Sequence, residues 1–246
     1  MIPFLLPFRR LLLVVPLCVA ISNADAQSEP QREVGFRAIT WEGRLADVAF
    51  EGEEGVSRID VNARRFTEPQ TYVGPSLMRF FRLGEASAED GEAARIPVGS
   101  VRLPEDSNQF LLIFLPHEGA GESRILAVPA GIPEFPPEYV KVWNLIDEEI
   151  FLQLNEERYR VRPRGDRLIY SEARGPENDE SGLAFGRSID VAMAYQAEGT
   201  RRQIYRSSWS MAANNRMLVF VYSRDESRPR VKTITEFLRD REDGSP

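Results

Sequence analysis

The sequence predicts an all-β protein made of two tandem antiparallel immunoglobulin-like β-sandwich domains. Three observations lead to this prediction: apolar residues recur with a period of two, the pattern of the first half returns in the second, and turn residues separate the apolar segments. About seven short strands in each half are typical of a sandwich of two packed sheets. A weak helical pattern is confined to the tail from Thr235 to Arg241.

The beginning of the chain predicts export. Arg9 and Arg10 precede an apolar run over residues 11–21, and the small residues Ala24 and Ala26 stand where a signal peptidase reads them. We therefore expect residues 1–26 to be a signal peptide, and the remaining 220 residues to be periplasmic or extracellular.

Cys18, the only cysteine, lies inside this segment, so the mature protein has no thiol for a disulfide or a metal site. A lipoprotein is the alternative, in which Cys18 is kept as the lipid-bearing terminus. Leu17 disfavours it, because a small residue precedes the modified cysteine of a lipoprotein. The apolar run is also shorter than the ~20 residues of a membrane span, so we expect no transmembrane segment after cleavage.

Composition excludes one class of partner. The formal charge of −7 becomes −8 when two arginines and one aspartate leave with residues 1–26. A nucleic-acid binder needs a basic surface that displaces counterions, so we expect no nucleic-acid partner.

The internal repeat defines the domain boundaries. Phe110–Leu115 aligns with Arg216–Val221 at an offset of 106 residues, and residues 123–128 align with 229–234 at the same offset without a gap. This pattern predicts one sandwich over residues 34–128 and a second over residues 139–235. Residues 129–138 form a Pro-rich linker, which should restrict how the two domains are oriented.

Individual strands follow from their patterns. Ile189, Val191, Met193 and Tyr195 alternate cleanly and should share one face. Residues 111–115 are apolar without interruption, which indicates a central strand covered on both sides, or a strand at a domain interface.

Residues 44–50 mix two faces, with Leu45 and Ala49 on one side and Val48 and Phe50 on the other. The segments 84–95 and 173–186 are longer than hairpins require, and we interpret them as loops that could form a binding site.

The first strand of the second domain, Tyr139-Val140-Lys141-Val142-Trp143-Asn144-Leu145, resembles the opening strand of β-sandwich modules in secreted bacterial proteins of uncharacterised function. The resemblance covers this strand and the repeat pattern. It implies a secreted module, and it brings no catalytic residues with it.

Catalytic and cofactor motifs are scarce. His117, the only histidine, stands in a glycine-containing loop with Gly119 and Gly121. A Ser-His-Asp relay or a histidine metal site would have to use it, and the simpler interpretation is a solvated loop residue. The two glycines are not a nucleotide-binding motif, because no helix follows them.

Acidic turns are the next candidates for chemistry. They comprise Glu51 with Glu53 and Glu54, Asp147-Glu148-Glu149, Glu156-Glu157 and Glu177-Asn178-Asp179-Glu180. A hydrolase could draw two carboxylates from such turns. Residues 177–180 could bind calcium, although their spacing is not that of an EF-hand.

Arginines cluster around a predicted hairpin that includes Arg158, Arg160, Arg162, Arg164 and Arg167. Alternate arginines on a strand share one face and could bind an anionic glycan or a phosphate in bidentate fashion. The simpler interpretation is a solvated face that pairs with nearby acids.

The same region contains Arg164-Gly165-Asp166, the tripeptide that integrins recognise, at a position where a hairpin turn would use a positive φ at Gly165.

Aromatic residues are expected in the core. Tyr72, Trp41, Trp143 and Trp209 are candidate core anchors. Phe80 and Phe81 must face opposite sides of one strand, so that one is in the core and the other is exposed or at the domain interface.

These observations favour an exported, non-enzymatic binding or assembly protein. Its partner would be a macromolecule, either a protein or a glycan, and it would have no cofactor, catalytic residue or metal ligand. The alternatives are a carboxylate-dependent carbohydrate-active hydrolase and a calcium-stabilised adhesion module.

Overall fold

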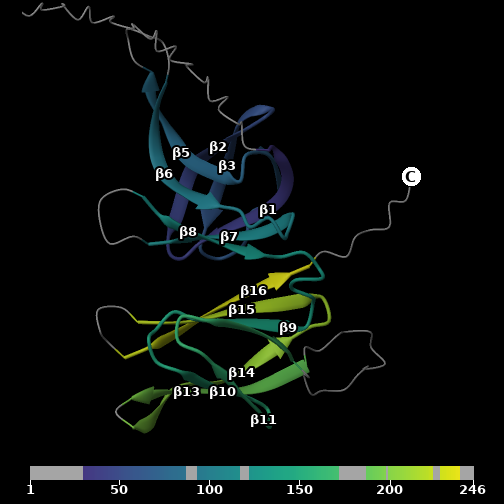
Figure 1. Ribbon diagram of the computed structural model, residues 1–246, viewed down its shortest axis with the longest axis vertical. Helices are drawn as coiled ribbons and strands as arrows, with labels where there is room; N and C mark the ends of the chain where they lie inside the picture. Colours follow the sequence, from purple (N-terminus) through teal and green to yellow (C-terminus); the bar gives the residue numbers. More distant parts are fainter. Residues whose placement is uncertain are drawn as a thin grey trace, which may run out of the picture.

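The structure, a computed structural model, describes residues 30–86, 93–116, 122–171, 187–197, 199–223 and 228–238. These residues form sixteen strands and no helix, arranged in four sheets of four strands. The all-β prediction is therefore confirmed. Figure 1 shows the sheets as successive layers, with β1–β8 in the upper half and β9–β16 in the lower half.

The strands of the first half are β1 (Arg32–Thr40), β2 (Arg44–Gly52), β3 (Gly55–Asn62), β4 (Gln70–Gly74), β5 (Leu77–Ala86), β6 (Ala93–Arg102), β7 (Gln109–Leu115) and β8 (Arg124–Pro129). They form an inner sheet ordered β4-β1-β7-β8 and an outer sheet ordered β3-β2-β5-β6.

The strands of the second half are β9 (Tyr139–Asn144), β10 (Ile150–Leu154), β11 (Glu157–Val161), β12 (Asp166–Tyr170), β13 (Arg187–Ala197), β14 (Thr200–Met211), β15 (Asn215–Tyr222) and β16 (Arg230–Phe237). Their inner sheet is ordered β12-β9-β15-β16 and their outer sheet β11-β10-β13-β14, so the two halves have the same strand order. The repeated segments, Phe110–Leu115 in β7 and Arg216–Val221 in β15, take equivalent places in it.

The prediction of purely antiparallel sheets is wrong at one strand pair in each half. β1 runs parallel to β7, and β9 runs parallel to β15. A two-residue hairpin forces its strands to be antiparallel, but these partners are separated by five intervening strands, which impose no such direction.

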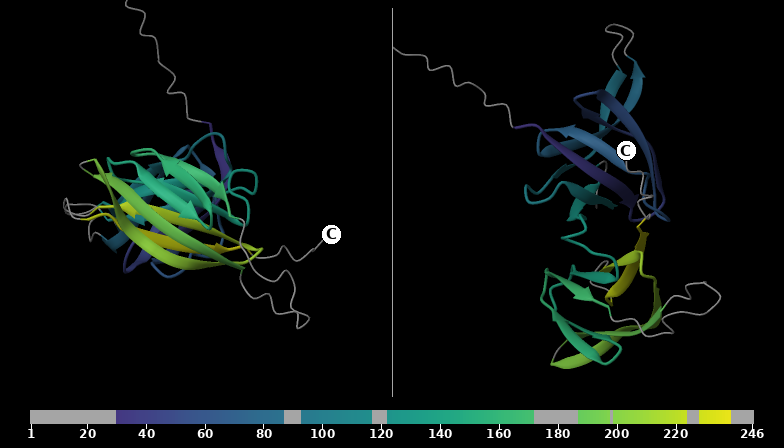
Figure 2. Two further views of the ribbon diagram at one scale, coloured as in Figure 1. Left: turned by 90° about the horizontal axis from the view of Figure 1, so that it is seen from below. Right: turned by 90° about the vertical axis from the view of Figure 1, so that its right-hand side faces the viewer.

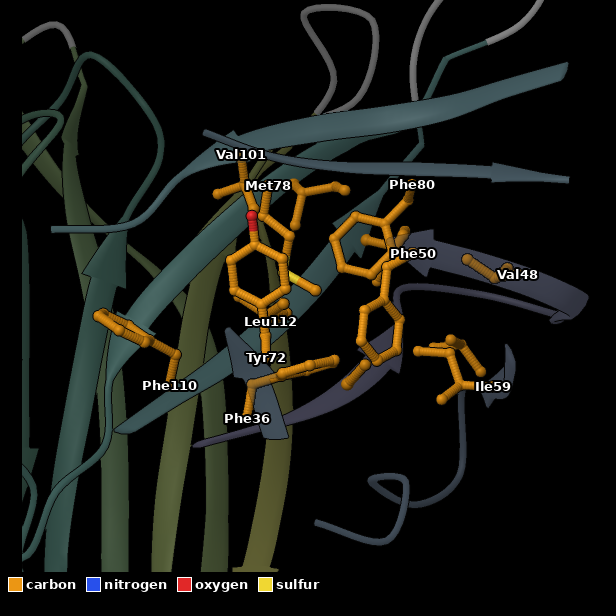
Figure 3. Close-up of a cluster of buried hydrophobic side chains, with 14 of the residues drawn as sticks. Phe36, Val48, Phe50, Ile59, Tyr72, Met78, Phe80, Val101, Phe110 and Leu112 are labelled. Atoms are coloured by element: carbon orange, nitrogen blue, oxygen red, sulfur yellow. The ribbon is translucent and has the colours of Figure 1, made fainter. Parts of the chain in front are cut away.

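Each half has its own core between its two sheets. In the first half the core is aromatic, and Figure 3 shows Phe36, Phe50 and Phe80 close together within it. The ring centroids of Phe36 and Phe50 lie 5.2 Å apart at an interplanar angle of 77°, which is the edge-to-face arrangement that aromatic pairs prefer. Tyr72 belongs to this core, as predicted.

The second core is largely aliphatic. Ile189, Val191 and Met193 of β13 lie in it together with Trp209, and Tyr195 packs against it, so the predicted shared face is confirmed. Trp209 Nε1 donates a hydrogen bond of 2.9 Å to the hydroxyl of Tyr205, which satisfies the polar atom of this buried ring.

A third apolar cluster joins the two inner sheets. It contains Leu111 and Ile113 of β7 and Leu218 and Phe220 of β15, with Trp41 at 7% exposure. In β7 the alternate residue Leu112 faces the first core instead. The uninterrupted apolar run of β7 therefore has both causes that the sequence suggested, since β7 is central in its sheet and lies at the interface between the halves (Figure 2).

The Pro-rich segment after β8 is part of this interface. Phe135 is fully buried in the third cluster, and its amide donates to the carbonyl of Gly131 at 2.9 Å. The guanidinium of Arg216 lies 4.7 Å from the centre of the Phe135 ring and donates to the Phe135 carbonyl. The segment is thus held by contacts in addition to its prolines.

Several local predictions are corrected. The tail is not helical up to Phe237, because residues 230–237 pair with β15 as strand β16. The predicted loop 84–95 is shorter, since β5 extends to Ala86 and β6 begins at Ala93. In β2 a bulge, with Asp47 at a φ of 52°, turns Leu45 toward the same core as Val48 and Phe50. Strict alternation placed Leu45 on the wrong face.

Candidate functional site

Several sequence candidates lie outside the described residues. They are Cys18 and the predicted signal peptide, His117 with Gly119 and Gly121, the acidic segment 177–180, the loop 173–186, and residues 87–92 of the other long loop. The structure therefore places neither the histidine nor the proposed calcium ligands.

The Arg164-Gly165-Asp166 tripeptide is not at a hairpin tip. β11 belongs to an outer sheet and β12 to an inner sheet, so the tripeptide lies where the chain crosses between them. The positive φ, 53°, is at Arg164 and not at Gly165, which corrects the sequence prediction. Arg164 forms two hydrogen bonds to Asp147, of 2.7 and 3.0 Å, while Asp166 lies 3.6 Å from Lys141. Both charges of the tripeptide are therefore engaged within the protein.

Two carboxyls in the described acidic turns have pKa values shifted away from those that a catalytic acid needs. Hydrogen bonds from Arg164 hold the pKa of Asp147 below its ordinary value, and Arg95 does the same to the pKa of Glu51. The general acid of a glycosidase needs a raised pKa, and the pKa values of these two carboxyls are shifted in the opposite direction. Within the described ranges no three His, Cys, Asp or Glu residues are grouped as metal ligands.

A groove of about 500 Å³ crosses the outer face of the sheet β11-β10-β13-β14. Its residues alternate with core residues on each strand: Phe151 and Gln153 on β10 lie between the core residues Ile150, Leu152 and Leu154. Ala192 and Ala194 line it on β13, where their small side chains leave the depression open.

Arginines surround this groove. Arg158 and Arg160 enter from β11, Arg201 from β14, and Arg206 from the adjoining part of the same face. We call this surface the arginine groove, and it comprises Phe151, Gln153, Arg158, Arg160, Ala192, Ala194, Arg201, Gln203 and Arg206. Cross-strand pairing orders it in two rows, Arg160–Phe151–Ala194–Gln203 and Arg158–Gln153–Ala192–Arg206.

Phe151 is the centre of the groove. The guanidinium carbon of Arg201 lies 4.0 Å from the centroid of its ring, and that of Arg160 lies 5.6 Å away. Such stacking orients a guanidinium while its edge N–H groups stay free for an anion. The two arginines are thereby held in place on the same ring.

The charge of this surface is not neutralised by the residues that the structure describes. None of Arg158, Arg160, Arg201 and Arg206 lies within ion-pair distance of a described carboxylate, whereas Arg44, Arg95 and Arg164 all pair with acids. The nearest acid along the face is Asp190, which pairs across the strands with Ser208 beyond the two rows. Of the two interpretations of the arginine cluster, pairing with nearby acids fits Arg164 and does not fit Arg158 or Arg160.

The predicted aromatic sites are distributed over the cores. Phe80 is in the first core, and Trp41 and Trp143 belong to the cluster between the halves. Phe81 does face the other side, but it is 6% exposed, because Arg95 covers its ring with the guanidinium carbon 4.8 Å from the centroid.

Sequence reasoning identified Arg158 and Arg160 and missed Phe151, Gln153, Arg201 and Arg206. The missing residues are on strands β10 and β14, which come together only through β13. Single residues spread over separate strands form no motif or periodic pattern in the sequence, so nothing in the sequence connected them.

In the described part of the chain no helix is long and apolar enough to cross a membrane.

Comparison with protein-family models found no match to this chain, and comparison with curated protein sequences found none either.

Proposed function

We propose that this protein is an exported, non-enzymatic binding protein whose arginine groove holds an acidic polysaccharide. The observation that carries the proposal is the set of four arginines on one sheet face, with no described acid in ion-pair contact and with two of them stacked on Phe151. An unneutralised group of guanidinium ions recognises anions through paired N–H donors.

The other polar groups of the face favour a sugar polymer over a protein. Gln153 and Gln203 offer amides, and Ser208 extends the face with a hydroxyl, which suits ligands rich in hydroxyl groups. The floor consists of Ala192 and Ala194 beside the Phe151 ring, which two arginines cover, so the groove has no deep apolar pocket for the large anchors typical of protein interfaces.

The two halves supply a rigid support for such a face. Immunoglobulin-like sandwiches arranged in tandem, exported by residues 1–26, are the architecture we propose for it. The apolar cluster between the inner sheets and the ion pair of Arg37 with Glu236, 2.9 Å apart, fix one half on the other. The outer sheets, including the arginine groove, are left to face a ligand.

Binding to a panel of polymers tests the proposal. Isothermal titration should detect binding to polygalacturonate or dextran sulfate, and none to neutral dextran. The double variant Arg160→Gln with Arg201→Gln should weaken that binding by about tenfold or more, since charge-assisted hydrogen bonds are lost. Arg58→Gln is the matched control, because Arg58 pairs with Ala49 as Arg160 pairs with Phe151 in the other half.

Two results would contradict the proposal. One is the absence of binding to every acidic polymer. The other is equal binding by the double variant and the wild type. A clear preference for poly-L-glutamate over both polysaccharides would instead identify an acidic protein segment as the partner.

The proposal that residues 1–26 direct export is tested by sequencing the N-terminus of the exported protein. Protein recovered from the medium or the periplasm should begin at Gln27 or within a residue or two of it. A mature terminus at a lipid-modified Cys18 would replace this model by a lipoprotein.

A further inference from the structure

The outer sheet of the first half contains a second version of the arginine groove. The pairing of β5 with β6 shifts between Phe80 and Phe81, where β6 has an extra residue, and the pairing of β13 with β14 shifts between Met193 and Ala194, where β14 has an extra residue. The bulges bring Phe81 and Ala194 to equivalent positions, and the two outer faces can be compared pair by pair from there.

The aromatic residue has changed strands between the two versions. Ala49 of β2 pairs with Phe81 of β5, while Phe151 of β10 pairs with Ala194. Each half thus has one phenyl ring and one alanine at this cross-strand pair, in opposite order. The arginine that covers the ring is kept: Arg95 is 4.8 Å from Phe81, and Arg201 is 4.0 Å from Phe151.

Arg95 and Arg201 are equivalent by register as well. Arg95 pairs with Leu83, two residues after Phe81, and Arg201 pairs with Gln196, two residues after Ala194. Arg95 on β6 and Arg201 on β14 therefore approach their rings from equivalent positions on equivalent strands.

The two faces differ in one carboxylate. Glu51, two residues after Ala49, is equivalent to Gln153, two residues after Phe151. The Glu51 carboxylate accepts two hydrogen bonds from Arg95, from Nη1 and, at 3.0 Å, from Nη2. Gln153 instead donates to the carbonyl of Asn155 at 2.8 Å, and Arg201 has no described acid as partner.

The other charged residues that line the two grooves differ in the same way. The groove of the first half is lined by Glu51, Glu53 and Glu122 beside Arg79 and Arg95. The arginine groove has Arg158 where the first half has Val56, and its described acid, Asp190, lines the part next to Arg206 without forming an ion pair with it. The first face therefore has acids beside its arginines, and the second has an excess of arginines.

We infer that the arginine groove receives a carboxylate of a polyuronate glycan on Arg201, in the place that the Glu51 carboxylate takes on Arg95, and that the first half is a self-occupied copy of this site. The inference rests on the proposed function and names its ligand group. A carboxylate is planar and accepts two parallel N–H donors from one guanidinium, which is the contact Glu51 already makes within this protein.

Exchanging Glu51 and Gln153 between the two faces tests the inference in both directions. The probe is a short oligogalacturonate, and isothermal titration gives both affinity and stoichiometry. Wild type should bind one equivalent. Gln153→Glu should supply an internal carboxylate to Arg201 and reduce the affinity at least tenfold, whereas the neutral Gln153→Met should stay within about threefold of wild type.

Glu51→Gln removes the carboxylate that Arg95 holds and should add a second binding equivalent, which no loss of folding can mimic. Combining it with Gln153→Glu should move the single site from the second half to the first. The thermal midpoint of each variant verifies that it is folded.

The failures are distinguishable. If dextran sulfate binds to the arginine groove while oligogalacturonate does not, the carboxylate inference is wrong and the proposed function stands. If no acidic polymer binds, the proposed function itself is wrong. Unchanged stoichiometry in Glu51→Gln, or unchanged affinity in Gln153→Glu, overturns the idea of a self-occupied copy.

Discussion

Arg216 and Glu236 stand directly opposite each other on β15 and β16 of the second half and form a buried ion pair. Arg216 Nε lies 2.7 Å from Glu236 Oε2, and the two side chains are 3% and 2% exposed. Arg37 of the first half reaches the other oxygen of Glu236 at 2.9 Å. One carboxylate therefore compensates two guanidinium groups from different halves.

Glu236→Gln should destabilise the protein by about 3 kcal/mol, because a buried guanidinium loses its counter-charge. Urea unfolding followed by circular dichroism measures the change. Asp147→Asn, which removes the partner of the exposed Arg164, is the matched control and should leave the midpoint almost unchanged. A Glu236→Gln variant as stable as wild type would show that the pair contributes no net stabilisation.

Phe220→Ala should destabilise the protein by about 4 kcal/mol, since it removes a fully buried ring from the cluster between the inner sheets. The ring centroid of Phe220 lies 5.3 Å from that of Trp41 in the other half. Calorimetry should show that both halves lose stability together. Phe237→Ala, at a residue that is 62% exposed, should have little effect. Two separate transitions, with only one displaced, would mean that the halves unfold independently.

Gly99→Ala should destabilise the first half by about 2 kcal/mol, within the usual cost of overpacking. A Cβ atom at this position would overlap the carbonyl oxygen of Ser123, and the amide of Ser123 donates to the carbonyl of Val98 at 2.6 Å. The obstacle is backbone, which cannot rotate away. Gly84→Ala, where the nearest atom would be 3.4 Å away, is the comparison and should be tolerated. Equal stability of the two variants would contradict the close approach of β6 to the start of β8.

Glu51→Gln also has a predicted pH dependence. The hydrogen bonds from Arg95 hold the pKa of Glu51 below its ordinary value, so folding favours the ionised form. Stability from this pair is therefore complete above the ordinary glutamate pKa of about 4.3, and it is lost as the pH falls through the lowered value. The difference in thermal midpoint between wild type and Glu51→Gln should be constant near neutral pH and should shrink in acid.

Glu54→Gln, at an exposed turn residue of the same hairpin, serves as the control for the loss of one negative charge. A difference for Glu51→Gln that grows in acid would have the wrong sign for a lowered pKa.

The sequence by itself determined the all-β class and the correspondence of β7 with β15. Both follow from local chemistry: alternation marks a strand with one apolar face, and the uninterrupted run 111–115 marks a strand with two. The offset of 106 residues holds for β8 and β16, where Val128 corresponds to Ile234, but it is one residue short for β7 and β15. Leu111 pairs with Val128 and Leu218 pairs with Ile234, and both leucines face the cluster between the halves, so the offset of β7 and β15 is 107. The connection from β15 to β16 is therefore one residue shorter than that from β7 to β8.

Elsewhere the offset changes, and the sequence alone did not reveal it. Glu51 corresponds to Gln153, an offset of 102 residues, while Phe81 corresponds to Ala194, an offset of 113. Loops of different length and the bulge of β2, which β10 lacks, produce these shifts. The register of long-range pairs depends on all the strands that meet, and local periodicity does not contain it.

Tertiary structure alone decided which arginines are compensated. Arg164 and Arg160 look alike in the sequence, yet Arg164 meets Asp147 across a crossover while Arg160 meets Phe151 on a neighbouring strand. Arg95 and Arg201 were equally indistinguishable until the sheets placed Glu51 beside one and Gln153 beside the other. An ion pair depends on a few ångströms between groups far apart in the chain, so charge counting from the sequence could not separate a neutral face from a binding face.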